Sequence, residues 1–361
     1  MFRKLLTLLM VFTLLGFCTT TANAGPRNNK DRVLTVMTRN MDAGSDFWYV
    51  LTADPTNLLS ILGGISATFQ EIHGSNIPAR ADGIAAEIQA TLPDLVGLQE
   101  VTTLSAGPDA THMAVVDDML ASLRAALAQR GLHYDAIVIQ KNADITLPAF
   151  DQAFNLISVG LTDFDVVLAR TDLPVSEFKL ENIQRAYFPL AHILQLEVAG
   201  VPIPFTRGWI AVDAKLRGKQ YRFVTTHLET FSDIIQALQT EDLLTGPLAS
   251  DLPVILAGDL NSDADAPNSS RGPAFGILTS AGFLDIWSNL HPNDPGFTWP
   301  LHPEDVPAAP PAVPQRIDLV LTHGDGTTAR SEILTGTAPV SGLWSSDHAG
   351  VVASFAVLPQ Q

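Results

Sequence analysis

The chain has 361 residues, of which 46% are hydrophobic, and a formal net charge of −17 at pH 7. This acidic excess repels polyanions at long range and argues against tight, sequence-independent nucleic-acid binding, although cations bound at a site can reverse the local sign and still allow phosphate-ester cleavage. The single cysteine, Cys18, lies near the N-terminus, so the rest of the chain has no disulfide, catalytic thiol or cysteine-ligated zinc site.

Residues 1–24 have the features of a signal peptide. Arg3 and Lys4 precede an apolar run too short to span a bilayer comfortably, and Ala22 and Ala24 form the small-residue pattern of a cleavage site. We expect cleavage after Ala24 and a secreted or periplasmic mature chain. Because no repeat or linker divides residues 25–361, we expect them to form a single domain.

Apolar and polar residues then alternate in segments typical of strands and helices. The helical patterns cover 78–92, 115–131, 231–244 and 272–283. The strand patterns cover 33–40, 94–101, 133–139, 163–170, a hairpin over 207–227, 252–261, 316–322 and 350–358. Between 140 and 205 the pattern is weak outside 163–170 and predicts loops or short hairpins, and 304–315 is a Pro-rich loop. The order predicts an α+β fold with mixed sheets and helices on the outer faces.

Several predicted strands end in side chains that can bind a cation or move a proton. Carboxylate and amide oxygens are the ligands that Mg²⁺ prefers, and imidazoles transfer protons or donate hydrogen bonds to phosphate. A lone carboxylate at a strand end is usually a turn residue, but six such segments favour a shared site. Its candidate residues are Asn40, Glu100, His227, Asp259, Asn261, Asp318, Asp347 and His348.

The motifs "TRNMDAG", "GLQEV", "THLET", "AGDLNSD", "RIDLVL" and "SDHAGV" together resemble the endonuclease/exonuclease/phosphatase superfamily. The resemblance covers about 33–357 in the family's order, although 140–205 carries no family motif. It implies a four-layer αββα sandwich: two packed mixed β-sheets flanked by helices. It also implies a metal-dependent phosphoric ester hydrolase of the phosphodiesterase, nuclease or phosphatase type, with Mg²⁺, Mn²⁺ or Ca²⁺ as cofactor.

The resemblance also assigns roles to individual residues. Glu100 resembles the main metal ligand, Asn40 the amide near that metal, and Asp347 a further carboxylate of the same site. Asp259 resembles the group that orients or deprotonates the attacking water or binds a second cation, and Asn261 a phosphate hydrogen-bond donor.

The two histidines complete the implied site. His348 resembles the imidazole that contacts the phosphate, and Asp318 the carboxylate that holds a catalytic histidine. His227 matches the first of two active-site histidines in phosphodiesterase-like members.

Other residues are weaker candidates for the site. Asp42 is as consistent with a turn as with the metal site. Arg207 could bind phosphate, but a surface hairpin arginine is the favoured interpretation. Glu229 is either a neighbour of the site or an acidic residue at a helix start. We expect Asp263 and Asp265 to be solvated, Trp287 and Trp299 to pack, and Asn182 and Arg185 to fall where a substrate-binding lip could lie.

The sequence thus predicts an exported Mg²⁺-dependent phosphoesterase whose metal-site water attacks a phosphate ester, with a phosphodiester favoured. The substrate could be a small molecule, a lipid head group or a nucleic acid. The alternatives are a secreted DNase-like endonuclease, a non-catalytic binding protein with this fold, and a calcium-stabilised domain using 259–265, which lacks the glycine and glutamate of an EF-hand loop. No protein partner or stable membrane insertion is expected; the apolar stretch 145–161 is better explained as a packed loop.

Overall fold

The computed structural model describes residues 33–198, 201–265, 272–301 and 313–356. The described residues belong to one compact unit. The predicted signal peptide and most of the Pro-rich segment lie outside the described residues. Among the helices in the described ranges, none combines the length and the apolar character that crossing a bilayer would require.

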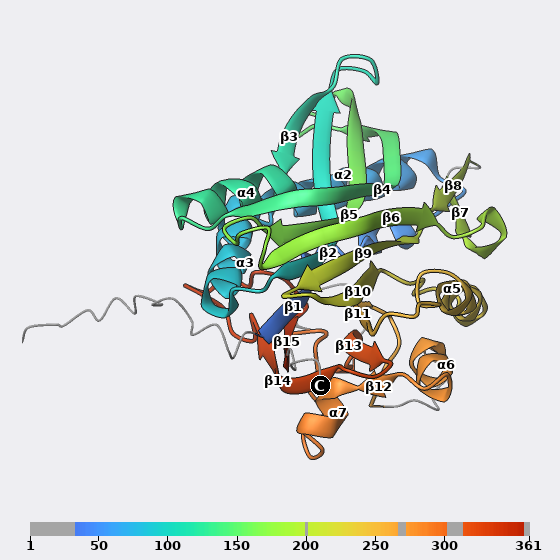
Figure 1. The fold of residues 1–361 in the computed structure, drawn as a ribbon. Helices are drawn as coiled ribbons and strands as arrows, with labels where there is room; N and C mark the ends of the chain where they lie inside the picture. The colour runs from blue at the N-terminus through green and yellow to red at the C-terminus, as the bar shows by residue number, and fades with distance from the viewer. Residues whose placement is uncertain (1–32, 199–200, 266–271, 302–312, 357–361) are drawn as a thin grey trace, which may run out of the picture. The chain divides into compact units, whose positions relative to one another are not determined.

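Two mixed β-sheets form the centre of the fold (Figure 1). The first has the order β14 (Thr328–Thr335), β15 (Gly350–Ala356), β1 (Val33–Asn40), β2 (Leu95–Gly107), β5 (Leu156–Arg170) and β4 (Tyr134–Phe150), with β3 (Ala114–Asp118) beside β2. The second has the order β12 (Leu284–Asp285), β13 (Asp318–His323), β11 (Val254–Asp259), β10 (Lys219–Thr226), β9 (Gly208–Leu216) and β6 (Phe178–Tyr187). A small hairpin pairs β7 (Leu194–Val198) with β8 (Val201–Phe205), after the 3₁₀ turn Leu190–His192.

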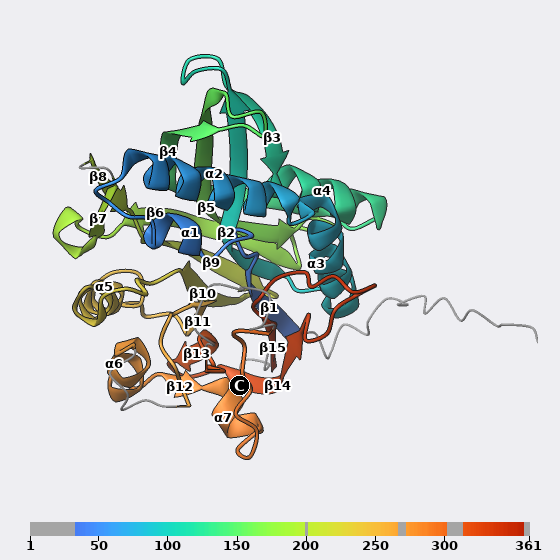
Figure 2. The ribbon, with the colours of Figure 1, turned by 180° about the vertical axis from the view of Figure 1, so that it is seen from behind.

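Helices cover the outer faces of both sheets. Figure 2 shows the first group in front of the first sheet: α1 (Trp48–Leu51), α2 (Leu58–Gly74), α3 (Ile77–Thr91) and α4 (Met119–Gln129). The second sheet carries α5 (Asp233–Thr245) and α6 (Ala274–Ser280), while α7 (Ile286–Leu290) lies near β14. These positions confirm the predicted four-layer αββα class.

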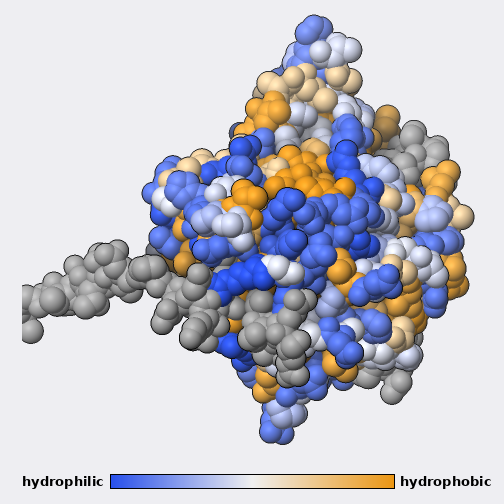
Figure 3. Space-filling model, in the orientation of Figure 1, coloured by the Kyte–Doolittle hydropathy of each residue, from blue (hydrophilic) through white to orange (hydrophobic). Residues whose placement is uncertain are grey.

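Three apolar cores hold the layers together. One lies between the first sheet and α2 to α4, one between the two sheets, and one between the second sheet and the α5–α6 pair. Strands in the middle layers are buried on both faces, which explains why β1 and β11 read as nearly continuous apolar runs. The face of the molecule in Figure 3 is mostly hydrophilic, with a hydrophobic cluster above its centre.

Some local predictions were wrong. The helix expected over 115–131 is a strand, β3, followed by α4, because the Asp118 side chain accepts a hydrogen bond from the Ala121 N–H and caps the helix there. The weakly patterned segment after 140 forms two long paired strands, β4 and β5, so the apolar stretch 145–161 belongs to a hairpin rather than a loop. Neither α2 nor β14 was predicted.

The topology brings the polar strand ends to one edge of the sandwich. β1 runs parallel to β2, and β10 runs parallel to β11, so the C-terminal ends of each pair point the same way. β13 and β15 run antiparallel to β11 and β1, so their N-terminal ends lie at that edge too. Segments that are distant in sequence therefore deliver their side chains to one place.

Candidate active site

The first sheet places Asn40 and Glu100 side by side. Asn40 ends β1, and Glu100 lies at a bulge in β2, where the pairing with β5 shifts between Leu98 and Val101. Glu100 has a φ of 55°, a left-handed conformation that costs a non-glycine residue about 1–2 kcal/mol. Bulges of this kind re-aim side chains at functional sites. Here the bulge breaks the alternation of β2 and brings Glu100 within reach of Asn40.

Asn40 links the carboxylates of the two sheets. Its Nδ2 donates to Glu100 Oε1 at 2.9 Å and to Asp259 Oδ2 at 3.0 Å. Its Oδ1 accepts from the Asp42 N–H at 2.8 Å. The amide nitrogen therefore faces the carboxylates, and the oxygen expected to approach a metal is used by the backbone. Asn40 thus orients Glu100 and Asp259 through its amide nitrogen, and its place near a metal stays a prediction.

The second sheet contributes Asp259, Asp318 and His227. Asp259 ends β11 opposite Asp318, the first residue of β13, and forms a bridge with His227 just after β10. His227 Nε2 lies 3.5 Å from Asp259 Oδ2 and 4.0 Å from Glu100 Oε1. Glu100, His227 and Asp259 each offer a ligand atom within 4.8 Å of the other two.

Asp347 and His348 arrive from the loop before β15. His348 Nδ1 bonds to Asp318 Oδ2 at 2.8 Å and lies 3.9 Å from Asp259 Oδ2, while its Nε2 lies 3.8 Å from Asp347 Oδ1. Asp347 Oδ2 accepts from the Trp299 indole N–H at 2.8 Å. Trp299 was expected to pack only; its contact with Asp347 makes it part of this site.

Asn261 follows Asp259 on the same loop and has a φ of 47°. Its backbone N–H donates to Asp259 Oδ1 at 2.9 Å, and its side-chain Nδ2 donates to the Leu228 carbonyl at 3.0 Å. The first bond fixes the Asp259 carboxylate. The second holds the Asn261 amide against the segment that follows His227.

The two histidines have opposite charge states. Burial and the neighbouring positive charges of Arg207 and His348 hold the pKa of His227 well below its ordinary value. Burial also disfavours charge on His348, but Asp318, Asp347 and Asp259 outweigh it and raise the pKa of His348 well above its ordinary value. At neutral pH the site thus holds a neutral imidazole and an imidazolium.

Arg207 fixes the tautomer of His227. Its Nη1 lies 2.6 Å from His227 Nδ1, and a guanidinium can only donate, so Nδ1 is an acceptor and the proton lies on Nε2. Arg207 is buried and also faces Asp163 and Asp165, whose carboxylates its charge stabilises. The prediction that Arg207 belongs to a surface hairpin was therefore wrong.

The carboxylates of the site have raised pKa values. Burial, Asp347 and Asp42 raise the pKa of Glu100 to about 7, against the effects of His348 and Asn40. Burial and Asp318 raise the pKa of Asp259 to about 7, and burial and Asp42 raise that of Asp347 to about 7. A cation among these groups would favour their ionised forms. The donor set, rich in carboxylate oxygen, fits a hard divalent ion such as Mg²⁺.

The weaker candidates divide between the site and its surroundings. Asp42 has a φ of 56° and pairs with buried Arg80 at 2.9 Å, close enough to Glu100 and Asp347 to affect their pKa values. Glu229 accepts from the N–H groups of Thr230 and Phe231 and so stabilises its own loop.

The remaining candidates do not contribute to the cluster. Asp263 is buried, contrary to expectation, whereas Asp265 is exposed. Asn182 bonds to Asp213, and Arg185 bonds to the carbonyl of Ile139 on β4. Trp287 packs, as expected.

Arg39 also supports the site and was not predicted from the sequence. Arg39 is fully buried and donates to the His348 carbonyl, to Ser345 Oγ at 2.9 Å and to Glu87 Oε1 at 2.9 Å. It thereby holds the loop that carries Asp347 and His348. Its position next to Asn40 in a buried strand was the available signal, because a charge there needs buried partners.

A sequence model of the endonuclease/exonuclease/phosphatase family matches residues 61–348, which is most of the chain. The chain belongs to the endonuclease/exonuclease/phosphatase family. Its members are metal-dependent phosphoesterases, so the predicted family and enzyme class are confirmed. No curated protein sequence matches the chain significantly.

Solved structures share the fold at low sequence identity. An endonuclease/exonuclease/phosphatase from Beutenbergia cavernae is 23% identical with a TM-score of 0.54, and the alignment covers 90% of this chain and 72% of that one. D. rerio TDP2, solved with a single-strand DNA product, is 19% identical with a TM-score of 0.52, covering 90% and 99%. A mannosyl-6-phosphatase from Bacteroides thetaiotaomicron is 17% identical with a TM-score of 0.52, covering 89% and 99%. These likenesses establish the fold.

Proposed function

We propose that this protein is an exported, Mg²⁺-dependent phosphoesterase that hydrolyses a phosphodiester by direct attack of water. The observation that carries the proposal is the cluster at the sandwich edge, where a neutral His227 and a cationic His348 lie within 4 Å of Asp259. Paired groups with opposite protonation states are typical of acid–base sites. A non-catalytic binding protein would have no need for this arrangement.

Glu100 and Asp347 are the groups that would hold Mg²⁺. Both carboxylates lie at the edge of the buried cluster, and their pKa values are raised by burial and by neighbouring carboxylates. When bound, the ion supplies positive charge that neutralises the phosphate and stabilises the leaving oxygen. Asn40 keeps Glu100 oriented for this role through the 2.9 Å bond from its amide nitrogen.

The chain's own groups supply the proton transfer and the phosphate contacts. Asp259, with a pKa of about 7, accepts the proton of the attacking water. His227 presents its Nε2–H beside Asp259, because Arg207 occupies Nδ1. This N–H donates a hydrogen bond to a non-bridging phosphate oxygen and keeps its proton. The His348 imidazolium, held by Asp318, stabilises the negative charge that develops on the phosphate.

The net charge favours a small phosphodiester over a nucleic acid as substrate. The chain carries 38 acidic residues against 21 lysines and arginines, which weakens attraction to a polyanion. Of the arginines closest to the cluster, Arg39 and Arg80 are committed to internal partners, and Arg207 is committed to His227. A DNase-like activity is the second outcome that the assay below distinguishes.

The test is hydrolysis of bis(p-nitrophenyl) phosphate and of p-nitrophenyl phosphate by the purified protein, with EDTA and after Mg²⁺ is restored. We expect faster cleavage of the diester, loss in EDTA and recovery with Mg²⁺. Mn²⁺ and Ca²⁺ arms identify the preferred ion, and a plasmid-nicking arm tests for nuclease activity. Absence of cleavage with every metal would support the binding-protein alternative instead.

Export is tested separately from chemistry. The proposal predicts that the native protein, recovered from the extracellular or periplasmic fraction, begins at Gly25 when its N-terminus is sequenced. Recovery of the chain with residues 1–24 intact in the cytoplasm would reject it.

A further inference from the structure

An apolar pocket of about 360 Å³ begins at the candidate active site and extends away from it. Glu100 and His227 line it at one end. From there it runs under α1 and α2, with the strands β2, β4 and β5 forming the opposite wall. The same cavity therefore joins the phosphate-binding groups to the layer between the helices and the first sheet.

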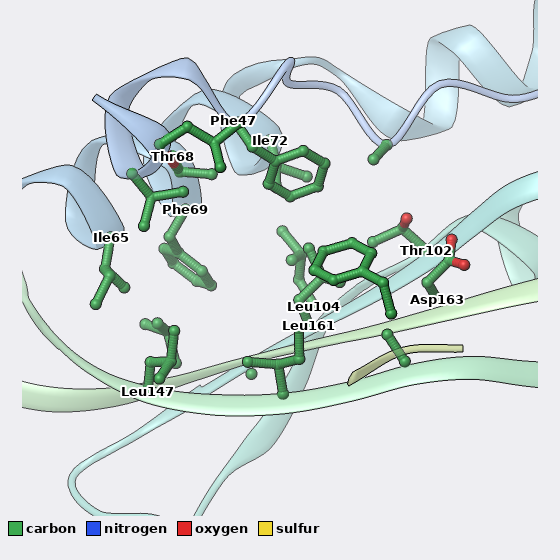
Figure 4. Close-up of a pocket in the computed structure, with 18 of the residues that line it drawn as sticks. Phe47, Ile65, Thr68, Phe69, Ile72, Thr102, Leu104, Leu147, Leu161 and Asp163 are labelled. Carbon is green, nitrogen blue, oxygen red and sulfur yellow. The ribbon is translucent and has the colours of Figure 1, made fainter. Parts of the chain in front are cut away.

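The two ends of the pocket differ in chemistry. Near the active site its lining is polar and includes Thr102 and Asp163, which Figure 4 shows at one end of the cavity. Along the rest, apolar side chains from α2 and from β4 and β5 face each other across the open space, among them Ile65, Phe69 and Leu147 (Figure 4). An amphiphilic cavity of this kind matches an amphiphilic ligand.

The part of the pocket away from the active site, lined by Ile65, Phe69 and Leu147 among others, is called the apolar arm, and it is unsuited to a sugar or a nucleobase. Such groups carry several donors and acceptors, each of which needs a partner when it is buried. Among the described residues that line the arm from α1 and α2, Thr68 alone has a polar side chain. Its hydroxyl is buried with no hydrogen-bond partner among the described residues.

We propose that this pocket binds one acyl or alkyl chain of the substrate, which is then an amphiphilic phosphate ester. The inference rests on the proposed function, because it takes the phosphate to lie at Glu100 and His227. With about 30 Å³ for each small group, the pocket has room for a segment of roughly ten methylenes. Burial of each methylene strengthens binding by about fourfold.

Calorimetric titration with alkylphosphocholines tests this directly. Chains of eight, ten and twelve carbons are added as monomers to the full-length mature protein in EDTA, which prevents turnover. We expect affinity to rise by about fourfold per methylene until the pocket is filled. Equal affinity for all three chain lengths would overturn the proposal.

Leu147→Trp fills the apolar arm and should weaken binding of the twelve-carbon probe by at least tenfold. The matched control is Thr146→Trp, which places the same side chain on the neighbouring, exposed position of β4 and should bind like the wild type. Should Leu147→Trp fail to fold, Ile65→Ala offers the opposite change. It enlarges the arm and should move the affinity optimum to a longer chain. Identical behaviour of the pocket variant and the control variant would reject the inference.

A second binding experiment identifies the source of the acyl or alkyl chain. Binding to monomeric probe but not to phosphatidylcholine vesicles supports a free single-chain ester, and binding to both supports a lipid drawn from a surface. Failure of this inference differs from failure of the proposed function. Wild-type cleavage of bis(p-nitrophenyl) phosphate without chain-length dependence removes only the pocket's role, whereas chain binding in a protein that cleaves nothing removes only the catalysis.

Discussion

Replacing Asp318 by asparagine tests the charge on His348. The carboxylate bonds to His348 Nδ1 at 2.8 Å, both side chains are buried, and Asp318 is the first among the groups that raise the pKa of this histidine. Without it, fewer carboxylates oppose the effect of burial, so the pKa of His348 falls and less of the imidazole carries a proton. The developing phosphate charge then loses one preorganised cationic donor, which is typically worth about 10²–10³-fold in rate.

The sign of the pH dependence follows from the same argument. In the wild type His348 stays protonated through neutral pH, so activity should be insensitive to its titration there. In Asp318→Asn the protonated form is lost as pH rises through the lowered pKa. The deficit in kcat/KM should therefore be smallest near pH 6 and grow towards pH 8.

The assay is hydrolysis of bis(p-nitrophenyl) phosphate at saturating Mg²⁺ across this pH range, with Asp325→Asn as control. Asp325 is exposed in the turn that follows β13, so the control makes the same chemical change outside the site. We expect little loss of thermal stability in Asp318→Asn, because one Asp318 oxygen is buried without a partner and the carboxylate also repels Asp259. Activity within threefold of the wild type at pH 8, in a folded variant, would refute the role of His348.

Three further predictions concern separate parts of the molecule. Glu100→Gln should lower turnover by several orders of magnitude with an unchanged melting temperature, and full activity with added Mg²⁺ would count against its metal-ligand role. Arg207→Met should lower kcat by about 10–10²-fold, because His227 is then no longer fixed in the tautomer with its proton on Nε2. The loss of one fixed tautomer should change the imidazole ¹⁵N chemical shifts of the metal-free protein, and unchanged shifts would contradict the assignment. Burial, with Asp285, raises the pKa of Glu332 well above its ordinary value, so the folded state binds its proton more tightly than the unfolded state and stability falls as pH rises above about 4.5. Glu332→Gln should therefore raise the free energy of unfolding at pH 8, measured by urea titration, by on the order of 1–3 kcal/mol. The free energies of unfolding of the variant and the wild type should converge near pH 4.5. A constant difference across pH would contradict this reasoning.

Local patterns predicted most elements that carry site residues. β1, β11 and β13 are short apolar runs that end or begin at polar side chains, and this contrast is visible without any structure. The patterns found the start of β4 and the end of β5 but missed the rest of both strands, whose long pairing mixes buried and exposed positions irregularly. Register shifts at 136–138 and 141–143 disturb the alternation there, so no short window shows a clear period.

The sequence by itself determined which chemical groups the protein has available and where each stands relative to its own strand. The periodicity of apolar residues, a local property, predicted mixed sheets with helices on the outer faces. The order of motifs around Glu100, Asp259 and His348 carried the family resemblance, and that resemblance implied the αββα class.

Only the tertiary structure decided how those groups act on one another. The 2.6 Å contact that makes His227 a neutral donor joins residues 20 positions apart, and Asn40 bonds to a carboxylate 219 positions away. The apolar pocket likewise exists only because α2 packs across the β4–β5 hairpin. Charge state, tautomer and cavity depend on distances set by long-range strand pairing and helix packing, and a linear pattern of residue types does not contain those distances.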